Sequence, residues 1–77
     1  MKHFLDFVVR SLVDNPDDVQ ITEVNREGET TYRASLHPAD VGLVIGKGGR
    51  TIGSIRSLIN ATTKSSDRLS VEVVENS

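Results

Sequence analysis

Apolar residues follow a helical period at the start of the chain and then alternate in shorter stretches. Six of them recur in pairs four residues apart, as on one face of an amphipathic helix: Phe4, Leu5, Val8, Val9, Leu12 and Val13. Pro16 ends this helix, because proline lacks an amide donor and disfavours helix in the residue before it. Val19, Ile21 and Glu23 then predict one face of a first strand.

Two further strands are predicted from alternation of apolar and polar positions. The polar segment 25–29 is typical of a hairpin turn between the first and second strands. The residues expected to face the core are Tyr32, Ala34 and Leu36 in the second strand and Leu69, Val71 and Val73 in the last. Because apolar side chains gather on one face of these strands, helices are expected to cover that face.

Two helices are expected between the second and last strands. Pro38 suits the first turn of a short helix over 39–45, with Asp40 near its positive N-terminal end. The second helix begins after a glycine-rich loop and runs to about residue 64, with a stripe of Ile52, Ile55, Leu58, Ile59 and Thr62. The order helix, strand, strand, helix, helix, strand predicts an α+β domain with a three-stranded sheet and helices on one face.

Composition narrows the class of protein. A chain of 77 residues buries too little surface for two cores, so one domain is expected. It contains no cysteine, which excludes disulfides and thiolate metal sites, and His3 and His37 are too far apart in sequence to suggest a metal pair. No apolar run approaches the roughly 18 residues of a membrane span. We therefore expect a cytoplasmic protein with no membrane segment, no metal and no cofactor.

Charge is unevenly distributed along the chain. Residues 1–40 hold four Lys or Arg and eight Asp or Glu, whereas residues 41–68 hold five Lys or Arg and one Asp. The overall net charge of −2 therefore conceals a basic segment around the glycine-rich loop. One local basic patch on an acidic body favours a short anionic ligand over unspecific binding along duplexes.

The segment 44–52 (VIGKGGRTI) gathers three glycines and two cations. Its spacing fits neither a nucleotide phosphate loop nor a dinucleotide fingerprint, whose third glycine would fall at Thr51. One alternative is a plain turn between helices, with Gly46 as a left-handed cap. Another is a clamp for a polymer backbone, since missing side chains admit a foreign backbone and helix-end amides attract phosphate. Three glycines exceed what a turn requires.

The residues from Val44 to Ile55 (VIGKGGRTIGSI) are similar to the signature of the K-homology (KH) domain, with 46–49 as its GxxG loop. That loop clamps the backbone of four nucleotides. The predicted element order resembles the type II form, a mixed three-stranded sheet in which a helix and a strand precede the core. The resemblance implies a single KH domain over 1–77, with an extension over about 1–25 and a core over about 29–75.

The N-terminal helix, the turn 12–17 and the segment 40–42 resemble the KhpA family of small stand-alone bacterial KH proteins. This resemblance implies a cytoplasmic RNA-binding protein that acts as an RNA chaperone or post-transcriptional regulator. It also implies pairing, as a homodimer or with a larger KH protein of the KhpB type, and a link to cell shape and cell-wall control. The alternative function is a structural subunit whose KH domain mainly pairs with other proteins. No catalytic constellation is evident, so we do not expect an enzyme.

The resemblance also implies a set of residues that contact single-stranded RNA. They are Gly42, Val44, Ile45, Gly46, Lys47, Gly48, Gly49, Arg50, Thr51 and Gly53. Lys47 and the amides of Gly48, Gly49 and Arg50 would hold phosphates, while Gly42, Val44 and Ile45 would form an apolar floor, with core packing an equal alternative for the last two. Contact of RNA with Arg56, Lys64 or Arg68 stays open; an internal ion pair is an alternative for Arg56. Phe4, Phe7 and Tyr32 are expected in the core, and both histidines at the surface or in caps.

Overall fold

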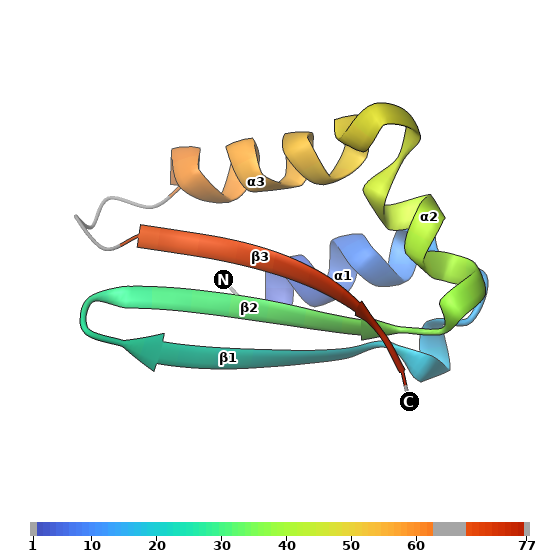
Figure 1. The fold of residues 1–77 in the computed structure, drawn as a ribbon, viewed down its shortest axis with the longest axis horizontal. Coiled ribbons are helices and arrows are strands. Elements are labelled where there is room, and N and C mark those ends of the chain that lie inside the picture. Colours follow the sequence, from blue (N-terminus) through green and yellow to red (C-terminus); the bar gives the residue numbers. More distant parts are fainter. Residues whose placement is uncertain (1, 63–67, 77) are drawn as a thin grey trace.

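The protein consists of a mixed sheet with helices packed against it (Figure 1). The computed structural model describes residues 2–62 and 68–76. In chain order the elements are α1 (Lys2–Leu12), the 3₁₀ turn η1 (Pro16–Asp18), β1 (Gln20–Arg26), β2 (Glu29–Leu36), η2 (Pro38–Asp40), α2 (Val41–Ile45), η3 (Lys47–Gly49), α3 (Arg50–Thr62) and β3 (Arg68–Glu75). This order confirms the predicted α+β architecture.

The sheet has the order β1-β2-β3. β1 runs antiparallel to β2, and β2 runs parallel to β3. The hairpin turn is shorter than predicted, because the strands remain paired up to Arg26 and Glu29. Only Glu27 and Gly28 connect them, with φ of 46° and 77°. Two positive φ values are typical of a type I′ turn, whose twist matches that of the flanking strands.

The core lies between the helices and one face of the sheet. Its buried apolar side chains are Leu5, Val9, Val19, Ile21, Tyr32, Ala34, Leu36, Val44, Ile52, Ile55, Ile59 and Val71. The alternation predicted for β2 is confirmed, since all three of its predicted inward residues are buried. Leu69 and Val73 of β3 are partly buried and pack against the same cluster.

Four apolar residues expected in the buried helical stripes or the core are exposed instead. Phe4, Phe7, Leu12 and Leu58 expose 42%, 70%, 37% and 52% of their surface. Each helix rests on the sheet with one narrow face, and residues two positions apart differ by about 200° around a helix. Phe7 lies two positions from both Leu5 and Val9, which are buried, so it points away from the sheet.

The start of α2 differs from the sequence prediction. Its first turn is the 3₁₀ segment η2, and the α-helix begins only at Val41. His37 caps η2, as expected of a capping residue, because its Nδ1 accepts a hydrogen bond of 3.0 Å from the amide of Ala39.

Asp40 does not cap α2 but turns inward, with 1% of its surface exposed. Its carboxylate accepts hydrogen bonds from the amide of Asp14 at 3.2 Å and from the amide and side chain of Asn15 at 3.0 and 3.1 Å. Burial would raise the pKa of Asp40, but the hydrogen bonds from Asn15 and Asp14 outweigh burial, and His37 adds a favourable charge. The pKa of this carboxyl group is therefore lowered.

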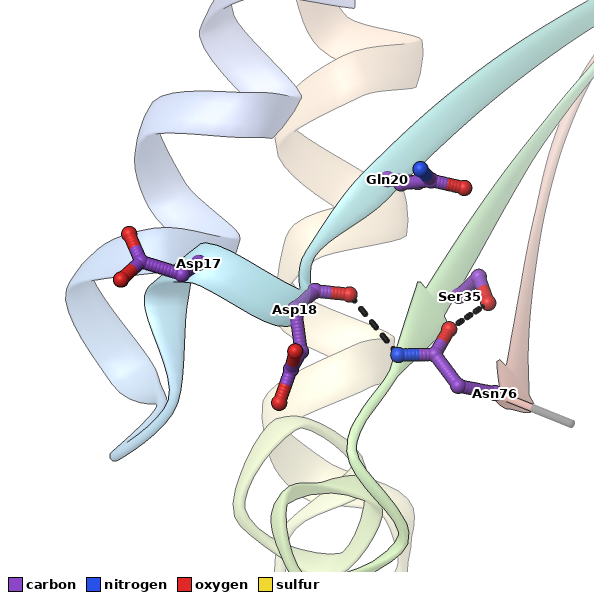
Figure 2. A pocket seen from close by; sticks show the side chains of 5 residues that line it. All are labelled: Asp17, Asp18, Gln20, Ser35 and Asn76. Carbon is purple, nitrogen blue, oxygen red and sulfur yellow. Dashed lines mark hydrogen bonds between the residues drawn. The ribbon is translucent and has the colours of Figure 1, made fainter.

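Asn76 fastens the end of β3 to two other segments. Its amide donates to the carbonyl of Leu36 at 2.7 Å, and its side chain donates to the carbonyl of Asp18 at 2.9 Å. Figure 2 shows this side chain between Asp18 and the hydroxyl of Ser35, which donates to the Asn76 Oδ1. The C-terminal end of β3 is thus joined to both β2 and η1.

We expect Asp40→Asn to lower the melting temperature by several degrees at pH 7, because its amide would face backbone donors with a donor of its own. The pKa of Asp40 is lower in the folded protein than in the unfolded chain, where an aspartate titrates at about 3.9. The stabilisation by its carboxylate is therefore fully present above about pH 3.9 and is lost as the pH falls through the lowered pKa of the folded state. Thermal unfolding followed by circular dichroism should therefore show a difference from wild type that shrinks below about pH 4.

Asp17→Asn is the matched control, since Asp17 is an exposed carboxylate in the neighbouring 3₁₀ turn. It should leave the melting temperature close to that of wild type. A difference for Asp40→Asn that stays constant from pH 7 to pH 3 would contradict the assigned role.

Candidate nucleic-acid interface

Gly46 ends α2 in a conformation that favours glycine. Its φ and ψ are 77° and 169°, and its amide donates to the carbonyl of Gly42 at 2.9 Å. This ψ differs from that of the left-handed helical cap considered from the sequence. The region is essentially restricted to glycine, because a side chain would collide with its own backbone.

Gly46 is also in close contact with Thr51, in the first turn of α3. A Cβ added at Gly46 would lie 2.7 Å from the Thr51 Cβ and 2.9 Å from its amide nitrogen. These separations are shorter than carbon and nitrogen atoms tolerate, so only glycine lets α2 and α3 meet at this angle. Thr51, predicted to contact RNA, is half-buried and has this packing role.

The tip of the loop is a tight turn that leaves open space above two glycines. Gly48 and Gly49 have φ of 66° and 78°, and a Cβ at either would meet nothing within 4 Å. The amide of Gly49 donates to the carbonyl of Gly46 at 3.1 Å, and that of Arg50 donates to the carbonyl of Lys47. Two of the three amides expected to hold phosphate are therefore already engaged within the turn.

Lys47 and Arg50 project into solvent on either side of these glycines. In the described part of the chain, the structure records no ion pair for either of them. Two other arginines form surface ion pairs: Arg10 with Asp6 at 3.0 Å, and Arg33 with Glu72 at 3.2 Å. The loop thus combines two uncompensated positive charges with backbone that an outside molecule can approach.

The apolar floor predicted beside the loop is only partly available. Val44 is fully buried and belongs to the core, which agrees with the core-packing alternative for this residue. Ile45 is half-buried against the same core, whereas Gly42 is exposed with open space above it. Leu43, which the sequence analysis did not single out, exposes 44% of its surface. Its position about 200° from Val41 in the helical period was the signal that could have identified it.

Gly53 is half-buried, and no atom lies within 4 Å of where its Cβ would be. It lies in a shallow depression on α3 together with Arg50, Ser54, Ser57 and Leu58. Close packing within the chain therefore does not account for glycine at this position.

The other cations considered from the sequence have different surroundings. Arg56 forms no recorded ion pair within residues 2–62 and 68–76; its Nη2 donates to the carbonyl of Val71 at 2.8 Å. Arg68 is exposed at the start of β3, and its amide donates to the carbonyl of Gly28 at 3.2 Å. Lys64 lies outside the described residues.

We also searched the described residues for metal-ligand clusters and membrane-spanning helices. There, no three His, Cys, Asp or Glu side chains come close enough to bind a metal ion. The described helices include none with the length and apolar character needed to cross a membrane. In the polar hollow of Figure 2, the carboxylates of Asp17 and Asp18 point in different directions.

Comparisons with known proteins agree with the nucleic-acid interface that the loop suggests. A family model described as the KH domain of KhpA/KhpB matches residues 2–74. The chain is 40% identical to the RNA-binding protein KhpA of Chlamydia pneumoniae over 97% of both chains. It is 41% identical to that of Clostridium acetobutylicum over 96% of this chain and the relative's full length. It is 38% identical to that of Thermotoga maritima over 96% of this chain and 99% of the relative. No solved structure gave a significant match.

The two kinds of loop glycine should respond differently to alanine. Gly46→Ala should lower the free energy of unfolding by about 3 kcal/mol, because the new methyl group meets Thr51 and the backbone conformation is strained. Gly48→Ala should lower it by about 1 kcal/mol, since only the left-handed conformation is unfavourable there. Urea unfolding of both variants measures the difference, and equal losses would contradict the Gly46–Thr51 contact.

Proposed function

Because the chain belongs to the KhpA/KhpB family of KH-domain proteins, we propose that it binds single-stranded RNA through the loop of residues 46–49. The KH resemblance drawn from the sequence is confirmed by this membership. The observation that carries the proposal is the open space above Gly48 and Gly49 between the exposed side chains of Lys47 and Arg50.

The loop holds a phosphate chain by two physical contributions. The ammonium of Lys47 and the guanidinium of Arg50 attract phosphates, and binding releases counterions from the nucleic acid. The bare backbone at Gly48 lets the sugar-phosphate chain approach without a steric barrier. Gly42, Leu43 and Ile45 of α2 offer apolar surface for bases. Val44 supports this surface from the core, and Gly46 and Thr51 fix the loop's shape.

Family membership supports a broader biological assignment. The protein acts as a binding protein and not as an enzyme, in the cytoplasm, as an RNA chaperone or post-transcriptional regulator. It works with a second KH protein of the KhpB type, in processes that affect cell shape and the cell wall. These finer assignments rest on the family and not on the geometry of the loop.

Changing Lys47 and Gly48 together to Asp should lower the affinity for a short unstructured RNA by about tenfold or more, because two carboxylates then face the phosphates. The fold should persist, since Lys47 is exposed and Asp is among the residues that tolerate the φ of 66° at Gly48. Fluorescence anisotropy with a labelled RNA, and with a duplex DNA for comparison, measures the effect. Wild type should bind the RNA more tightly than the duplex.

The hairpin turn provides a closely matched control at the opposite end of the sheet (Figure 1). Changing Arg26 and Gly28 to Asp alters the net charge by the same amount and also places Asp at a glycine with positive φ. This variant should keep most of the wild-type affinity. If the loop variant is folded and binds RNA as wild type does, the proposed site is wrong.

A second candidate function is pairing with another protein, and the exposed apolar side chains favour it. Phe4 and Phe7 of α1 and Leu58 of α3 leave large apolar areas in contact with solvent. Contact with a second KH domain would remove this surface from water. Pairing and RNA binding are compatible in one protein.

Sedimentation velocity should detect a dimer at micromolar concentrations. Phe7→Ser should shift the equilibrium toward monomer if α1 takes part, because it removes apolar area without touching the core. The Lys47 and Gly48 double variant should still dimerise. A monomer at every concentration tested would exclude self-pairing.

A further inference from the structure

Asp40 is the only charged residue that is buried in the described part of the chain. The RNA-binding loop proposed above does not use it. Its carboxylate accepts hydrogen bonds at the turn after α1, from the amides of Asp14 and Asn15 at 3.2 and 3.0 Å and from the Asn15 side chain at 3.1 Å. Removing a carboxylate from water is costly, and an apolar residue of similar size would fill the same space without that cost. Packing alone therefore does not account for aspartate at this position.

Asp40 stands directly before the helix that leads into the glycine loop. Its amide donates to the carbonyl of His37 at 2.8 Å, which fixes its backbone in η2. α2 follows and ends five residues later, and Val44 is its only buried residue. So short a helix is not stable by itself, and one buried side chain does not fix the direction of its axis. The contact of Gly46 with Thr51 holds the C-terminal end of α2, and Asp40 holds the N-terminal end.

The turn that Asp40 binds is itself fixed by two other elements. The Nη1 of Arg10, in α1, donates to the carbonyl of Pro16 at 2.6 Å. The side chain of Asn76, directly after β3, donates to the carbonyl of Asp18 at 2.9 Å. The segment 14–18 is therefore held on the body of the domain, and the hydrogen bonds of Asp40 join the start of α2 to this fixed segment.

We propose, building on the RNA-binding function above, that Asp40 is a positioning residue for the glycine loop. By holding the start of α2 on the turn at residues 14–15, it sets where residues 46–49 meet the nucleotide backbone. Hydrogen bonds have preferred distances and angles, so these bonds fix the helix more narrowly than apolar contact does. With 1% of its surface exposed, Asp40 touches no ligand and acts only through α2.

The test is the sign of the change in RNA affinity for Asp40→Asn. This substitution removes one negative charge, and charge alone would leave the affinity for a polyanion unchanged or raise it. The proposal predicts the opposite: the Kd for a short uracil-only RNA should rise about threefold or more, because the loop is no longer held in its binding position. Asp17→Asn makes the same change in net charge at an exposed site, and its Kd should equal that of wild type or be lower. Fluorescence anisotropy measures both, at a temperature where circular dichroism shows folded protein.

Two further variants separate positioning from a loss of stability. Asn15→Ala removes a donor at the other end of the same contact, far from the loop in sequence, and should also raise the Kd. Because both changes break one interaction, their effects on affinity should not add in the double variant. Ile21→Val removes a buried methyl group from β1 and lowers stability without removing a hydrogen bond to Asp40. Its Kd should match that of wild type.

Amide resonances report the position of the loop without RNA. In spectra of the free protein, the resonances of residues 46–51 should shift in Asp40→Asn and Asn15→Ala but stay in place in Ile21→Val. Unshifted loop resonances in both tie variants would overturn the positioning role whether or not RNA binds.

The affinities decide the inference separately from the loop proposal. An unchanged Kd for folded Asp40→Asn, or an equal rise for Ile21→Val, overturns the inference and leaves the RNA-binding loop in place. If Asp40→Asn does not fold, the Kd and the resonances of Asn15→Ala decide in the same way. Absence of binding by wild type to any single-stranded RNA overturns both proposals.

Discussion

The contact between Gly46 and Thr51 is the constraint on which the candidate site depends. α2 has only five residues, so it cannot set the direction of the chain by its own stability. The direction is set where the bare backbone of Gly46 touches the first turn of α3. That contact fixes the position of the loop tip, where open space lies above Gly48 and Gly49, and it sets where α3 begins. A glycine that looks like a ligand-binding feature thus acts first as a packing feature.

Asp40 connects this region to the N-terminal extension. Its carboxylate replaces water with donors from Asp14 and Asn15, so a charge that would be unfavourable in the interior is satisfied there. The residue therefore joins the turn after α1 to the turn before α2. α1 also covers the inner face of the sheet with Leu5 and Val9. The N-terminal extension therefore packs in the same core as the two helices that flank the glycine loop.

Among the described residues, some positive charges are paired with carboxylates and others are not, a difference that composition does not show. Arg10 and Arg33 are neutralised locally by carboxylates. Lys47 and Arg50 stand in solvent beside the loop, and Arg56 is held by a neutral carbonyl that leaves its charge uncompensated. A net-acidic protein can therefore present a basic surface at one place. This separation is the physical reason that a net charge of −2 is compatible with a nucleic-acid partner.

The sequence by itself determined the order of elements, the inward faces of β2 and β3 and the location of the glycine loop, because these follow from local periodicity and backbone preference. The sequence analysis did not separate buried Val44 from exposed Leu43, because in a five-residue helix the position of Leu43 relative to Val41 is only a weak signal. The exposure of Phe4, Phe7 and Leu58, the inward turn of Asp40 and the bond from Arg56 to Val71 were decided only by the tertiary structure. Each depends on which segments, distant in sequence, lie close enough to bury a side chain or accept its hydrogen bond.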